Sequence, residues 1–108
     1  MHPLELIEQP SGGYALILAA GTTPVDSVIE ELGHEPNGYF WEGVARRLAP
    51  DLDGRFEYDP EGDTFVALGT DRAALEDLAN RMAAVATDAD RMRTLVAEAE
   101  AAGFEFDD

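Results

Sequence analysis

Short apolar runs separated by turn-forming residues open the chain and recur in its middle. Residues 4–8 and 14–19 flank one loop rich in Gly, Pro and Ser, and residues 55–59 and 64–69 flank a second turn. Apolar runs of this length on either side of such turns are typical of β-hairpins. The pattern therefore predicts two hairpins, one in each half of the chain.

Between and after the hairpins, apolar residues return every three or four positions, which is the spacing of one helix face. Helices are expected over residues 24–32, 39–49, 71–86 and 88–101. Thr23, followed by Pro24, suits the start of the first helix, and Thr87 suits the start of the last. The order ββααββαα predicts one α+β domain over residues 1–108, with a four-stranded antiparallel sheet and helices on one face.

Charge composition narrows the chemistry that the chain can perform. It carries 23 acidic and 7 basic residues, for a formal net charge of −16, and it has neither Cys nor Lys. These absences exclude disulfides, thiolate metal sites, a Cys nucleophile and a Schiff-base Lys. Because phosphate attraction needs a basic face, we expect no direct nucleic-acid binding. The acidic surplus either serves solubility alone or attracts a basic partner.

The sequence also predicts where the protein works. No apolar run approaches the ~18 residues of a membrane span, and the start of the chain lacks the basic and apolar regions of a signal peptide. We therefore expect a cytoplasmic protein that does not bind membranes.

Candidate catalytic and metal-binding residues are few. His34 beside Glu35 has the chemistry of an acid–base pair or of two metal ligands, but a lone His in a Gly-flanked loop indicates a solvent-exposed turn residue. The acidic turns at 51–54 and 59–63 lack Gly and Glu at the positions that a calcium loop requires. No Ser lies in a strand–turn–helix elbow. The sequence thus predicts no catalytic residue, no metal, no cofactor and no enzyme activity.

Three successive aromatic residues begin the second predicted helix. Each helical step turns the chain by about 100°, so Tyr39, Phe40 and Trp41 cannot all face the core. Trp41 follows the apolar period, which leaves Tyr39 or Phe40 partly exposed as a possible binding anchor. In the alternative interpretation, Asn37 or Gly38 caps the helix and the aromatic residues only cover the edge of the sheet.

An acidic zone adjoins these aromatic residues. The helix over 24–32 buries its apolar face, so its three acids should point outward, and two further acids extend the zone beyond the helix. The predicted partner-binding residues are Asp26, Glu30, Glu31, Glu35, Tyr39 and Glu42. An aromatic side chain among carboxylates combines a desolvated anchor with charges that steer a basic partner. The alternative is a solvated helix face without a partner.

Two stretches of the sequence resemble the immunity protein 51 family. They are residues 25–48, which contain the distinctive Gly-Tyr-Phe-Trp-Glu-Gly at 38–43, and residues 56–71. The resemblance implies a small α+β protein encoded beside polymorphic bacterial toxins, which protects the producing cell by binding and blocking a cognate or related toxin. The alternative function is an acidic regulatory or adaptor module for an unrelated basic protein. A gene for a large secreted toxin next door would favour the first.

Overall fold

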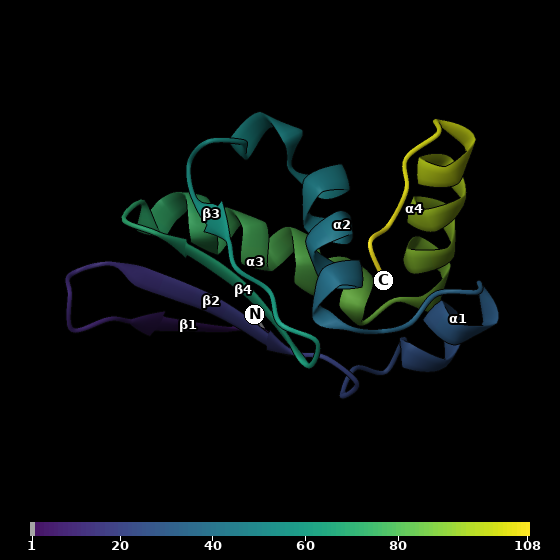
Figure 1. The fold of residues 1–108 in the computed structure, drawn as a ribbon, viewed down its shortest axis with the longest axis horizontal. Coiled ribbons are helices and arrows are strands. Elements are labelled where there is room, and N and C mark those ends of the chain that lie inside the picture. Colours follow the sequence, from purple (N-terminus) through teal and green to yellow (C-terminus); the bar gives the residue numbers. More distant parts are fainter. Residues whose placement is uncertain (1) are drawn as a thin grey trace.

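The computed structural model describes residues 2–108 and contains a four-stranded antiparallel sheet with four helices (Figure 1). The elements in chain order are β1 (Glu5–Glu8), β2 (Tyr14–Ala19), α1 (Asp26–Glu31), α2 (Gly38–Leu48), the 3-10 turn η1 (Pro50–Leu52), β3 (Glu57–Tyr58), β4 (Thr64–Gly69), α3 (Arg72–Ala86) and α4 (Ala89–Ala101). The predicted α+β class and the order ββααββαα are confirmed. No helix within residues 2–108 is both long and apolar enough to cross a membrane.

The two hairpins join through their inner strands. The order across the sheet is β1-β2-β4-β3, so β2 and β4 lie at the centre and run antiparallel to each other. Their register places Leu16 opposite Ala67 and Leu18 opposite Phe65. All four of these side chains are fully buried. They therefore define the face of the sheet on which the core is built.

Helices α2 and α3 pack on this face (Figure 1). Helix α2 packs against β4, and α3 packs against β1, β2 and β4. Helix α4 packs on α3, and α1 packs chiefly on α4. The two aromatic residues Phe40 and Trp41 lie fully buried where α2 enters the core. The expectation that Trp41 is buried is confirmed, and Tyr39 is the aromatic residue that stays exposed.

Carboxylate and amide side chains begin three of the helices. The Asn37 side chain accepts a hydrogen bond from the Phe40 amide at 2.9 Å, and Asp71 accepts one from the Ala74 amide at 3.1 Å. At α4 the expected cap was wrong, because Asp88 accepts from the first-turn amides. The Thr87 hydroxyl instead donates to the Ala83 carbonyl at 2.7 Å and closes the end of α3.

Helix α1 is shorter than expected, since it begins at Asp26 rather than at Pro24. The Thr23 hydroxyl donates to the Asp26 carboxylate at 2.6 Å instead of capping a helical amide. The backbone of residues 23–26 consequently forms a separate turn, which the Asp26 N–H closes on the Thr23 carbonyl at 3.3 Å.

Strand β3 was expected over 55–59 but pairs only at Glu57 and Tyr58. The Arg55 amide donates to the Leu52 carbonyl at 3.0 Å, so the chain is still closing the preceding turn at that point. Phe56 is buried. The alternating apolar pattern correctly predicted a strand here, but residues 55 and 56 belong to the preceding turn.

Candidate functional site

The predicted acidic zone spans α1, the loop after it and the first turns of α2. Glu30, Glu35 and Tyr39 are exposed, and within residues 2–108 Tyr39 is one of two large hydrophobic side chains with substantial exposure, at 42%. Neither Glu30 nor Glu35 makes an ion pair within residues 2–108. These three side chains are therefore free to meet a partner.

The other three predicted residues already have partners inside the molecule. Asp26 accepts the Thr23 hydroxyl. Glu31 pairs with Arg93 of α4 at 2.8 Å, and Glu42 pairs with Arg46 one turn along α2 at 2.9 Å. Both pairs are solvent-exposed, and such pairs contribute little to stability and exchange readily for others.

His34 is not the exposed turn residue that the sequence predicted. Its side chain is only 13% exposed, and its Nδ1 lies 3.0 Å from the Asp108 carboxylate while its Nε2 lies 3.3 Å from Glu100. The ring also packs edge-on against Phe106, at 5.0 Å between ring centres. The residues after α4 fold back between α4 and α2 (Figure 1). Asp108 and Phe106 of this segment cover the His34 ring.

This C-terminal segment, residues 102–108, fixes the loop between α1 and α2. The Glu35 amide donates to the Asp108 carboxylate at 2.8 Å. Phe106 stacks on Phe40 at 4.9 Å between ring centres. No group of three or more His, Asp or Glu side chains in the described part of the chain is placed to hold a metal ion. The cluster around His34 is therefore suited to holding the loop in position.

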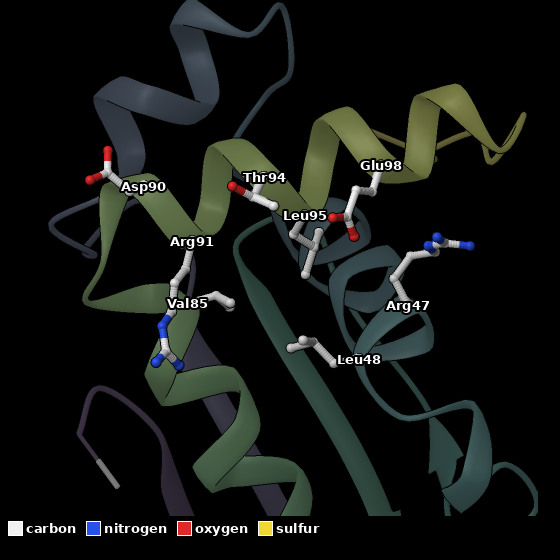
Figure 2. A pocket seen from close by; sticks show the side chains of 8 residues that line it. All are labelled: Arg47, Leu48, Val85, Asp90, Arg91, Thr94, Leu95 and Glu98. Carbon is white, nitrogen blue, oxygen red and sulfur yellow. The ribbon is translucent and has the colours of Figure 1, made fainter.

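A pocket that the sequence did not reveal lies between α2, α3 and α4, with a volume of about 390 Å³. Figure 2 shows the side chains of Leu48 of α2, Val85 of α3 and Leu95 of α4 around a common space, with charged side chains farther out. The lining residues are Arg47, Leu48, Val85, Asp90, Arg91, Thr94, Leu95 and Glu98. Its apolar residues have ordinary helical spacing, so the sequence pattern marked them only as core positions.

Arg47 at the rim of this pocket differs from the other arginines. It makes no ion pair with any residue from 2 to 108 and instead places its guanidinium 5.6 Å from the centre of the Phe104 ring. None of the six predicted partner-binding residues lines the pocket. It is an apolar hollow with a mixed-charge rim.

Comparison with known proteins assigns the family. A family model described as immunity protein 51 matches residues 4–101 of the 108-residue chain. The chain belongs to the immunity protein 51 family. No curated protein and no solved structure gives a match.

The immunity protein 51 match covers the whole sheet and reaches the last residue of α4. The earlier resemblance is therefore confirmed, and with it an immunity role in toxin systems and a toxin protein as the partner. The matched range ends at residue 101, so Phe104, Phe106 and Asp108 of the C-terminal segment lie beyond it.

Proposed function

We propose that this protein neutralises a cognate or related bacterial toxin by stoichiometric occlusion, with its acidic surface facing a basic site on the toxin. We place this action in the cytoplasm of the producing cell. The surplus of 16 negative charges supports the proposal, together with membership of the immunity protein 51 family. Toxins that cleave nucleic acid have basic clefts for phosphate, which an acidic protein can occupy in place of the substrate.

The arrangement of the basic residues strengthens this argument. Six of the seven arginines pair with carboxylates of the same chain. Each internal pair neutralises one arginine together with a carboxylate, so pairing leaves the net charge of −16 unchanged and, within residues 2–108, most carboxylates without an arginine partner. The remaining carboxylates therefore present a negative field that speeds encounter with a cationic surface.

Within this function, we assign the first contact to the acidic zone of Asp26, Glu30, Glu31, Glu35, Tyr39 and Glu42. Tyr39 supplies an exposed ring beside carboxylates, which is the composition of an interface anchor. Glu30 and Glu35 supply charge that no arginine of the chain neutralises.

The test measures binding to the toxin domain encoded beside this protein's gene. Glu30→Lys should slow association and flatten its salt dependence, because the carboxylate acts at long range. Tyr39→Ala should speed dissociation and cost about 2 kcal/mol of binding free energy, or roughly thirtyfold in Kd.

Glu105→Lys is the matched control for Glu30→Lys, because Glu105 is also exposed and lies outside the zone. All variants must keep the wild-type circular dichroism spectrum. Equal affinities for wild type, Glu30→Lys and Tyr39→Ala would place the interface elsewhere. Failure of the wild-type protein to bind or protect against the toxin would refute the immunity function proposed for this pair.

A further inference from the structure

The side of the sheet opposite the core is apolar at its centre. Side chains alternate between the two faces of a strand, so the register assigns each residue to a face. On the face away from the core, Ala15 of β2 pairs with Ile7 of β1 on one side and with Leu68 of β4 on the other. Ile17 of β2 pairs with Val66 of β4 on the same face. These five residues form a continuous apolar patch on three adjacent strands, here called the outer patch.

Four of the five residues of the outer patch reach solvent, while Ala15 at its centre is only 4% exposed. Ile7 is 43% exposed, and Ile17, Val66 and Leu68 are all partly exposed. Antiparallel sheets with one face in the core normally carry polar residues on the other face. Because the core is completed on the opposite face by Leu16, Leu18, Phe65 and Ala67, stability of the core does not require an apolar residue in the outer patch.

Acidic residues bound the outer patch on both edge strands. Glu5 of β1 lies opposite Ile17, and Glu57 of β3 lies opposite Leu68, all on the same face. Asp59 continues this edge, since its amide donates to the Val66 carbonyl at 2.9 Å. The four strands contain no Lys or Arg. The patch therefore has an apolar centre and acidic edges with no base in any strand; Arg55, which lines a hollow beside Glu57 and Leu68, pairs with Asp71.

We infer that the outer patch is a docking surface for the toxin, and this inference rests on the immunity function proposed above. Its occupant is a toxin surface with an apolar ridge flanked by Lys or Arg on both sides. The two acidic edges are three strand spacings apart, or about 14 Å. This width accommodates a helix of ~10 Å diameter that lays its apolar face on the patch and its basic flanks on the acids.

A second copy of this chain fits the patch poorly. Apposing two identical sheet faces would bring Glu5, Glu57 and Asp59 of each copy against acids of the other. Each copy also carries a net charge of −16. A basic partner gains from the same edges that repel a second copy.

The test replaces apolar side chains of the outer patch with polar ones that carry no charge and have a similar preference for β-strands. The double variant Ile17→Thr/Val66→Thr keeps a β-branched side chain at both positions, so the sheet should form normally. We expect at least tenfold weaker toxin binding, almost entirely through faster dissociation, with unchanged salt dependence. Glu57→Gln should instead flatten the salt dependence of association.

The control is Leu95→Gln, which removes a half-buried apolar side chain from the pocket between α2, α3 and α4. It should leave toxin affinity unchanged. Wild-type affinity in Ile17→Thr/Val66→Thr, with wild-type binding intact, would overturn the docking assignment and leave the immunity function standing. A wild-type dimer in sedimentation equilibrium that the double variant converts to monomer, without loss of toxin affinity, would likewise overturn it in favour of a second copy.

Discussion

Replacing Gly38 with Ala should displace the N-terminus of α2 from the turn between β3 and β4. The Gly38 amide donates to the Gly62 carbonyl at 3.1 Å, so the helix begins directly on that turn. A Cβ at residue 38 would lie 2.8 Å from the Thr64 carbonyl carbon and still closer to the carbonyl oxygens of Glu61 and Thr64. These are backbone atoms, and no change of rotamer can move them away.

The distances set the size of the effect. Carbon atoms are in comfortable contact from about 3.5 Å, so helix and turn must separate by at least ~0.7 Å. Overpacking costs typically about 1–3 kcal/mol, and a clash with rigid backbone belongs at the upper end. Ala gains at most ~1 kcal/mol over Gly in a helix. We therefore expect a net loss of about 2 kcal/mol, which lowers Tm by roughly 8–16 °C in a domain of this size.

Thermal denaturation followed by circular dichroism measures this loss. Gly62→Ala is the matched control, because a Cβ at residue 62 of the same turn meets no atom within 4 Å. Its free energy of unfolding should stay within about 0.5 kcal/mol of wild type. A Tm for Gly38→Ala within about 2 °C of wild type would show that the helix–turn contact yields easily and would refute the reasoning.

Three further predictions concern the C-terminal segment and two titrating groups. In Gly43→Ala, the new Cβ would lie 2.5 Å from a Phe106 ring carbon, so amide hydrogen exchange should accelerate over residues 104–108. Tm should stay nearly constant, because the higher helix propensity of Ala offsets the stability lost in the C-terminal segment. Burial raises the pKa of Tyr58 to about 12. An unfolded phenol titrates near 10, so stability should fall as the pH rises from 10 to 12, and Tyr58→Phe should abolish that fall in denaturant titrations. The hydrogen bond from Arg81 holds the pKa of Asp51 below its usual value of 3.8, so this pair stabilises the fold above that pH and the benefit disappears on acidification. In Asp51→Asn, the free energy of unfolding should therefore fall less steeply as the pH is lowered. An acid-unfolding slope equal to that of wild type would contradict this assignment.

Elements set by local periodicity were predictable from the sequence. The apolar spacing in α2 identified Trp41 as buried, and geometry required one of its aromatic neighbours to be exposed. The acids of α1 likewise face away from the core because Val28 and Ile29 face into it. In each case the decisive residues lie within one or two turns of each other.

Features that depend on distant parts of the chain were not predictable in this way. The burial of His34 depends on Asp108 and Phe106, more than seventy residues away in sequence. The pairing of β2 with β4 likewise has no local signal, because nothing within either strand identifies its partner across the sheet. The outer patch follows from that pairing, and so the sequence pattern alone did not reveal it.

The central position of β2 and β4 has a consequence for the speed of folding. Their nearest paired residues, Ala19 and Thr64, are 45 positions apart, and α1, α2 and β3 lie between them. Closing a loop of that length costs roughly 3 kcal/mol of chain entropy before any contact of the pair compensates for it. Non-local pairing of this kind slows folding, so the chain should fold more slowly than a helical bundle of the same size. The central pair of the sheet therefore forms only after this closure, whereas each hairpin can form from contacts that are local in sequence.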